Sequence, residues 1–151
     1  MRLFRSAPAF LAALLLGSGL AATEAGWGTD LEAGKTRAAK EGKALVVYFT
    51  GSAWCPPCKL LHAELLPSKA FGDFAKAKVL VMLDYPPLSG RSEEKVKADP
   101  ALAALMKTKG EYRITGFPTM VVLAADGREL GRKMGYDKGK PPEAYLADLV
   151  K

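Results

Sequence analysis

The chain contains two cysteines, which stand two residues apart in the stretch 48–59, YFTGSAWCPPCK. A dithiol with C-x-x-C spacing can close into a small disulfide ring and reopen by exchange with another disulfide. With no third cysteine in the sequence, neither sulfur has a competing partner. A purely structural bridge is the less favoured alternative, because closing so short a loop removes little chain entropy. The spacing therefore predicts thiol-disulfide chemistry at Cys55 and Cys58.

The residues around the pair predict a strand followed by a helix that begins at the first cysteine. Residues 44–49, ALVVYF, form an apolar and β-favouring run that suits a strand covered on both faces. Pro56 and Pro57 lack backbone N–H groups, which a helix tolerates only in its first turn. The two prolines therefore place Cys55 at the N-terminus of the helix.

This helix gives the two thiols different roles. The helix dipole and the free backbone donors favour a thiolate at Cys55, and the pKa of C-x-x-C thiols can fall from about 8.5 to about 7 or lower. Cys58 recurs with Leu61 and Leu65 on one apolar helix face and is expected to point into the core. We therefore expect Cys55 to be the nucleophile and Cys58 to be the resolving thiol that attacks the mixed disulfide.

Two stretches, in this order, resemble the motifs of the thioredoxin superfamily. Residues 54–59, WCPPCK, resemble the active-site motif, and residues 112–119, YRITGFPT, resemble the segment that carries the cis-proline loop. The resemblance extends from about Trp27 to the C-terminus. It implies an α/β fold, with a central mixed β-sheet flanked by helices, and a cis-proline beside the cysteine pair. It also implies that the backbone before this proline pairs with substrate. The substrate-binding residues expected on this basis are Trp54, Pro56, Pro57, Phe117 and Pro118.

The sequence departs from thioredoxins proper in two places. Tyr48 stands where thioredoxins keep a buried aspartate that exchanges protons with the second cysteine, and Leu80 stands near the lysine that accompanies it. The proton of the second cysteine must then pass to water or to another group. In addition, the interval from Asp84 to Pro118 is longer than its thioredoxin counterpart by about one helix. The insertion, residues 85–99, is either a partner-recognition loop or a tolerated surface insertion, since loop length costs little.

Residues 1–25 have the composition of a secretory signal peptide. They combine a basic start, an apolar stretch over residues 9–16 and small-x-small sites that predict cleavage within residues 19–26. An uncleaved anchor is less favoured, because a transmembrane helix needs about 20 apolar residues. No cysteine precedes the pair, which argues against a lipid anchor through cysteine. We therefore expect a single thioredoxin-like domain, residues 26–151, located in the periplasm or secreted.

The remaining pattern is typical of a single α/β domain. Residues 29–32, TDLE, predict a capping-box start for a helix that ends near Gly42. The other predicted elements are a strand over 79–83, a short charged helix within the insertion, a helix from Asp99 that ends at Gly110, a hairpin of strands 119–123 and 129–134, and a final helix from Pro141 that buries Leu146, Leu149 and Val150.

Charge and the lone histidine restrict the other classes of function. The formal net charge of +6 comes from basic residues interspersed with acidic ones, so no nucleic-acid partner is expected. His62 lies four residues after Cys58, but a site made of these two residues and Cys55 would offer three ligands where closed structural zinc uses four. An ordinary position on the helix flank is the preferred interpretation of His62. Lys59 excludes haem attachment, and no metal or other cofactor is expected.

These observations predict an exported, monomeric thiol-disulfide oxidoreductase that acts on protein disulfides or dithiols. Pro57 before the second cysteine resembles the reducing members of the superfamily, so we expect reduction rather than oxidation. A redox partner, for example a membrane electron donor, would then have to restore the dithiol. The alternatives are a disulfide oxidase or isomerase, and a non-catalytic carrier in which Cys55 and Cys58 hold Cu(I). The reduction potential distinguishes the first alternative, and stoichiometric copper binding without turnover distinguishes the second.

Overall fold

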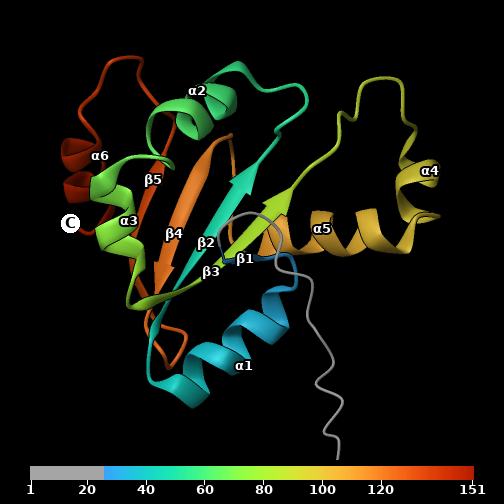
Figure 1. The fold of residues 1–151 in the computed structure, drawn as a ribbon. Helices are drawn as coiled ribbons and strands as arrows, with labels where there is room; N and C mark the ends of the chain where they lie inside the picture. The colour runs from blue at the N-terminus through green and yellow to red at the C-terminus, as the bar shows by residue number, and fades with distance from the viewer. Residues whose placement is uncertain (1–25) are drawn as a thin grey trace, which may run out of the picture.

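The computed structural model describes residues 26–151, so the predicted signal peptide lies outside the described residues. Strands and helices alternate along most of this part of the chain (Figure 1). In chain order the elements are β1 (Trp27–Gly28), α1 (Leu31–Glu41), β2 (Ala44–Thr50), α2 (Pro56–Glu64), α3 (Lys69–Ala75), β3 (Lys78–Asp84), α4 (Glu93–Lys97), α5 (Pro100–Glu111), β4 (Thr119–Leu123), β5 (Glu129–Met134) and α6 (Pro142–Leu149). Among the helices of residues 26–151, none is long and apolar enough to cross a membrane.

The five strands form one mixed sheet in the order β1-β3-β2-β4-β5. Strands β1, β3 and β2 run parallel, whereas β4 is antiparallel to both β2 and β5. Strand β2 lies at the centre and is buried from Leu45 to Thr50, as expected for a continuous apolar run. The arrangement is the central mixed sheet that the sequence predicts.

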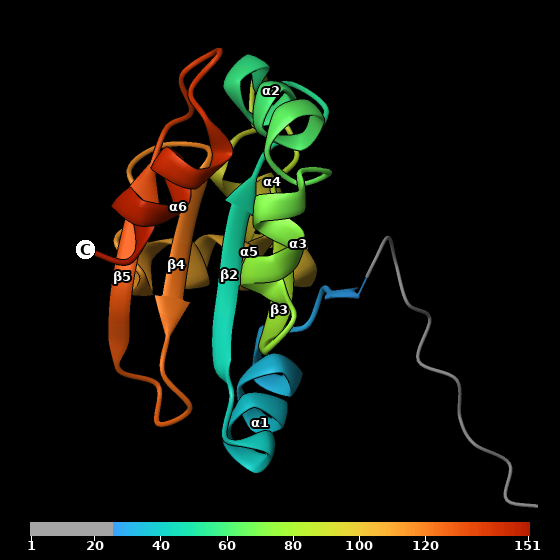
Figure 2. The same ribbon diagram turned by 60° about the vertical axis from the view of Figure 1, so that its left-hand side comes forward.

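Helices cover both faces of the sheet (Figure 2). The core on one face joins α2, α3 and α6 to the sheet and includes Tyr48, Leu61, Phe71, Tyr145 and Leu149. The core on the other face joins α1 and α5 to the sheet and includes Leu31, Val47, Phe49, Leu105 and Val121. Because alternate residues of a strand point to opposite faces, β2 supplies both cores.

Two helix boundaries differ from the predicted ones. Asp30, rather than Thr29, caps α1, and its carboxylate accepts a hydrogen bond from the N–H of Ala33 at 2.9 Å. Aspartate is at least as good an N-cap as threonine, and this start places the first helical residue in the core. Gly42 ends α1 in the left-handed conformation, as predicted, with φ of 63°. Gly110 does not end α5, which continues for one more residue.

Two further differences concern short apolar segments. The sequence prediction lacks α3, whose seven residues are too few to show a clear period. Ser68 begins this helix by accepting the N–H of Phe71 at 3.1 Å. The final helix lies where it is predicted, but Val150 is 50% exposed, because α6 ends one residue earlier and the chain leaves the helical path. Tyr145 is instead fully buried under this helix.

The register of the sheet brings the two sequence motifs together. Phe49 of β2 pairs with Thr119 of β4, and the next residue, Thr50, pairs with Asp84 of β3. The loop that follows β2, the loop that precedes β4 and the end of β3 therefore meet at one edge of the sheet (Figure 1). Helix α2 begins at this edge.

Candidate active site

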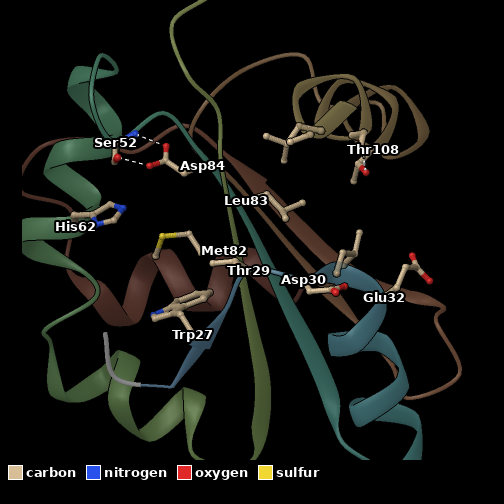
Figure 3. Close-up of a pocket in the computed structure, with 14 residues that line it drawn as sticks. Trp27, Thr29, Asp30, Glu32, Ser52, His62, Met82, Leu83, Asp84 and Thr108 are labelled. Carbon is tan, nitrogen blue, oxygen red and sulfur yellow. Dashed lines mark hydrogen bonds between the residues drawn. The ribbon is translucent and has the colours of Figure 1, made fainter. Parts of the chain in front are cut away.

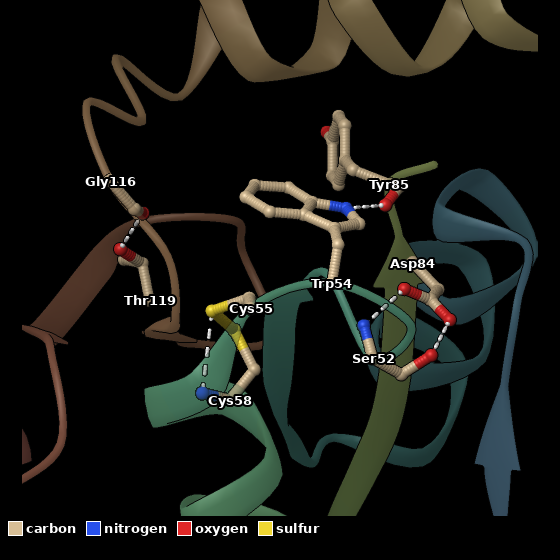
Figure 4. The surroundings of a disulfide bond; sticks show 8 residues. All are labelled: Ser52, Trp54, Cys55, Cys58, Asp84, Tyr85, Gly116 and Thr119. Atoms are coloured by element: carbon tan, nitrogen blue, oxygen red, sulfur yellow. Dashed lines mark hydrogen bonds between the residues drawn. A yellow bond between two sulfur atoms is a disulfide. The ribbon is translucent and has the colours of Figure 1, made fainter. Parts of the chain in front are cut away.

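Cys55 and Cys58 form a disulfide at the N-terminus of α2, with their Cα atoms 5.2 Å apart (Figure 4). Cys55 is the N-cap of the helix, and its Sγ accepts a hydrogen bond from the backbone N–H of Cys58 at 3.3 Å. Pro56 and Pro57 occupy the first two helical positions, where a missing N–H costs nothing. The predicted helix start at Cys55 is confirmed.

The disulfide is set into the protein surface rather than projecting from it. Cys58 is completely buried on the same helix face as Leu61 and Leu65, as predicted, whereas Cys55 keeps 3% of its surface exposed. A substrate sulfur approaching from solvent therefore meets Cys55 first. Both sulfurs are buried, and Cys55 is the one that keeps some exposed surface.

The loop that precedes β4 lies beside the disulfide. Its Phe117–Pro118 peptide bond is cis, as the resemblance implies. The hydroxyl of Thr119 donates to the Gly116 carbonyl at 2.8 Å (Figure 4), and the N–H of Gly135 donates to the Pro118 carbonyl at 2.7 Å. Within residues 26–151, neither the N–H nor the carbonyl of Phe117 takes part in a hydrogen bond. This backbone edge is available to an extended polypeptide.

Trp54 forms a wall of the site, directly before the first cysteine (Figure 4). Its ring packs edge-on against Phe117, with ring centroids 5.7 Å apart, and its Nε1 donates to the Tyr85 carbonyl at 2.7 Å. Tyr85, the first residue of the insertion, is buried, and its hydroxyl donates to the Leu105 carbonyl of α5 at 2.9 Å. These contacts hold the indole in place, although the side chain of Trp54 stays 42% exposed.

Sequence reasoning missed three residues that shape this edge of the sheet: Ser52, Asp84 and Tyr85. The backbone N–H of Ser52 donates to Oδ1 of Asp84 at 2.8 Å, and its hydroxyl donates to Oδ2. This clamp ties the loop before the disulfide to the end of β3 (Figure 4). One signal was available, since Asp84 is a polar residue at the C-terminal end of a buried parallel strand, where ligand-facing side chains gather.

Tyr48 lies on the face of the sheet that α2 covers and is fully buried. The centroid of its ring is 5.4 Å from that of His62 and 5.9 Å from that of Trp27. Burial raises the pKa of Tyr48 far above its ordinary value, so its hydroxyl stays neutral. It does not replace a carboxylate as a proton acceptor at neutral pH.

His62 is half-buried on the flank of α2, as its preferred interpretation implied. Its side chain points into a cavity of about 850 Å³ that is also lined by Trp27, Met82 and Asp84 (Figure 3). The cysteines do not line this cavity. In the described part of the chain, no three or more His, Cys, Asp or Glu side chains are grouped so that they would hold a metal ion.

The fold and the paired cysteines define the class of this protein. Residues 31–149 match the family model of the thioredoxin-like domain, so the chain belongs to the thioredoxin-like family that its two motifs resemble. The chain is also 33% identical, over 101 residues, to the disulfide bond reductase DsbH of Chlamydia pneumoniae. That match covers 66% of this chain and 57% of the relative, so the chain spans little more than half the length of DsbH.

Solved structures agree with this assignment. A structure of a DsbH oxidoreductase superposes with a TM-score of 0.63 at 27% identity, over 91% of this chain and 90% of that one. A thioredoxin from Thermus thermophilus gives a TM-score of 0.56 at 20% identity, over 79% of this chain and 80% of that one, which supports the fold alone. The predicted thioredoxin-like fold is confirmed.

Proposed function

We propose that this protein is a thiol-disulfide oxidoreductase that reduces disulfides of protein substrates outside the cytoplasm. The observation that carries this proposal is the Cys55–Cys58 disulfide at the start of α2, beside the unpaired backbone edge of Phe117. Two features support the reducing direction: Pro57 precedes the second cysteine, and the similar protein of Chlamydia pneumoniae is a disulfide bond reductase. The signal-peptide composition of residues 1–25 supports export of a domain that spans residues 26–151.

The reduced protein would act in two exchange steps. The thiolate of Cys55, favoured by the helix N-terminus, attacks one sulfur of the substrate disulfide and releases the other substrate sulfur as a thiolate, which takes up a proton. Cys58 then loses its proton and attacks the sulfur of Cys55. This step forms the Cys55–Cys58 disulfide and frees the second substrate thiol, so two electrons pass to the substrate.

The surroundings of the pair would give each side chain a part in these steps. The open backbone of Phe117 is placed to pair with an extended substrate segment, with Trp54, Pro56, Pro57 and Pro118 around it. Since Tyr48 stays neutral, water or another group, such as the departing substrate thiolate, would accept the proton of Cys58. An external dithiol donor, such as a membrane electron donor, would then return two electrons to the disulfide.

The reduction potential tests the direction. We expect a value nearer the thioredoxin value of about −270 mV than the value of about −120 mV found for a strong oxidant, a gap of about 7 kcal/mol. Equilibration of the protein with a glutathione series, followed by tryptophan fluorescence, measures it. A potential above about −170 mV would reverse the direction in favour of an oxidase or isomerase.

Trapping experiments test the roles of the two cysteines. Cys58→Ser removes the resolving thiol, so covalent complexes with substrate should accumulate through Cys55. Cys55→Ser should trap none, because the remaining thiol is completely buried. Non-reducing electrophoresis of each variant after incubation with a disulfide-bonded protein gives the result. Equal trapping by both variants would show that the roles are assigned wrongly.

A further inference from the structure

The insertion and helix α5 line an open pocket that also contacts Trp54 and Phe117 of the active site. The pocket has a volume of about 460 Å³, which is within the range of ligand pockets. Its lining includes Trp54 and Phe117 of the active site, Pro86 and Leu88 of the insertion, and Met106 and Lys109 of α5. Apart from Lys109 and Ser89, all the side chains that line the pocket are apolar or aromatic.

We propose that this pocket selects protein substrates by binding an apolar side chain located a few residues from their disulfide. The proposal rests on the proposed function, because it concerns which substrates reach the Cys55–Cys58 pair. It assigns residues 85–89 of the insertion to substrate recognition. The occupant is a leucine, methionine or phenylalanine side chain of an extended substrate segment.

Exposed apolar side chains gather around the pocket and the neighbouring loop. Trp54 is 42% exposed and Leu88 is 38% exposed, although both are large and apolar. Met134, which is 56% exposed, lies against Gly116 on the other side of the loop that precedes β4. Trp54 and Leu88 share the lining of the pocket, and neighbouring exposed apolar groups mark interaction surfaces more often than isolated ones do. Their position around the disulfide points to the substrate as the partner.

Hydrogen bonds within the protein hold the base of the pocket in place. Tyr85 lies at the base of the insertion, and its carbonyl accepts a hydrogen bond from the indole N–H of Trp54. Its own backbone N–H donates to the Thr50 carbonyl at 2.8 Å, and its hydroxyl donates to a carbonyl of α5. Two consecutive prolines then restrict the backbone, and the N–H of Arg91 closes a turn onto the Leu88 carbonyl at 3.0 Å. A preformed pocket binds with a smaller loss of conformational entropy.

Geometry links the pocket to a substrate already paired at the active site. Phe117 belongs to both places, since its backbone is the open edge and its ring lines the pocket. An extended segment advances about 3.3 Å per residue and alternates its side chains between two sides. We therefore expect the side chain that enters the pocket to lie within about four residues of the reacting cysteine. The ammonium group of Lys109 would disfavour lysine or arginine there.

A set of disulfide-bonded peptides that differ at one position tests the proposal. Each peptide carries one cysteine in a serine and glycine background and is oxidised to its symmetric disulfide dimer. One further position, between four residues before and four residues after the cysteine, holds leucine, serine or lysine. The second-order rate constant of the pre-reduced protein with each peptide is measured by stopped-flow tryptophan fluorescence. At one position or two alternating positions, leucine should raise this rate constant at least about fivefold over serine, and lysine should not.

Two variants then locate the effect. Leu88→Asp, at a partly exposed position, should remove the advantage of leucine at that position. Lys95→Ala is the matched control, because its exposed side chain lies on the same insertion, in α4, and does not line the pocket. This control should keep the advantage, and circular dichroism of both variants checks that they fold.

The possible failures are distinguishable. If the wild-type protein reduces all peptides at rates that do not depend on the position of leucine, the pocket proposal is overturned while the proposed function stands. If Leu88→Asp folds and keeps the full preference, the pocket is likewise not the site of selection. If no peptide is reduced at any position, the proposed function is overturned, and the recognition proposal falls with it.

Discussion

Replacing Gly51 with alanine should displace the indole of Trp54 while leaving the disulfide loop in place. A Cβ at position 51 would lie 2.5 Å from Cε2 and 2.7 Å from Nε1 of Trp54, closer than real side chains approach. The backbone of Gly51 is held, because its carbonyl accepts the N–H groups of Trp54 and Cys55 at 3.1 and 2.9 Å. The ring must therefore move, and its partial exposure lets it swing toward solvent.

The size of the effect follows from the two contacts that the ring would lose. The hydrogen bond from Nε1 to the Tyr85 carbonyl contributes about 1 kcal/mol, and the edge-on contact with Phe117 contributes about 1 kcal/mol more. We expect the free energy of unfolding to fall by about 2 kcal/mol. At 1.4 kcal/mol per factor of ten, the rate of protein-disulfide reduction should fall by at most about 30-fold, because Trp54 no longer forms a wall of the site.

Three measurements read out this change. The two tryptophans give two indole N–H signals in a ¹H–¹⁵N NMR spectrum, and one of these signals should shift. Urea unfolding measures the free energy of unfolding. Reduction of a disulfide-bonded protein measures the rate of disulfide reduction. Gly72→Ala in α3 is the control, because a Cβ there meets no atom within 4 Å and alanine favours the helix by up to about 1 kcal/mol. If Gly51→Ala leaves both indole signals and the reduction rate unchanged, the role given to Trp54 is wrong.

Two further predictions concern stability. Gly34→Ala should lower the free energy of unfolding by about 1 to 2 kcal/mol, as measured by urea titration, because the new Cβ overlaps Cγ2 of buried Val81. This overpacking exceeds the gain in helix propensity from alanine. An increase in stability would contradict this packing. Hydrogen bonds from Lys43 and Arg37 lower the pKa of Glu41 from 4.5 to about 2, so its stabilising contribution should be present above pH 4.5 and lost as the pH falls through about 2. Since these groups are exposed, high salt should weaken the pH dependence of the stability. Glu41→Gln should remove part of this pH dependence in unfolding curves measured between pH 5 and 2. If neither high salt nor Glu41→Gln changes it, the assignment to Glu41 is wrong.

The arrangement of the cysteine pair was open to prediction because it depends on neighbours in the chain. Pro56 and Pro57 have one acceptable place in a helix, and this fixes Cys55 at the N-cap without any tertiary information. The spacing of Cys58 and Leu61 likewise places Cys58 on the apolar face of the helix. The hairpin of β4 and β5 follows from a local turn, and its strands have the predicted bounds.

The residues that support the pair could not be predicted in the same way. The Ser52 to Asp84 clamp and the contact from Trp54 to the Tyr85 carbonyl join positions that are far apart in the sequence and adjacent only through the register of β2 and β3. Neither contact leaves a periodic pattern. The carbonyl of Tyr85 is a backbone group, so its role would be the same for many side chains, and no sequence motif marks it.

The insertion is joined to the active site through Trp54. This side chain touches the loop after β2, the Phe117 ring and the first residue of the insertion, so a shift in any of the three changes a shared wall. Tyr85 is 2% exposed and makes hydrogen bonds to β2, Trp54 and α5, which a loosely tolerated surface loop would not require. Residues 88–95, in contrast, are exposed. The physical division therefore runs within the insertion: its base is part of the framework of the site, and its tip presents Leu88 to whatever enters the pocket.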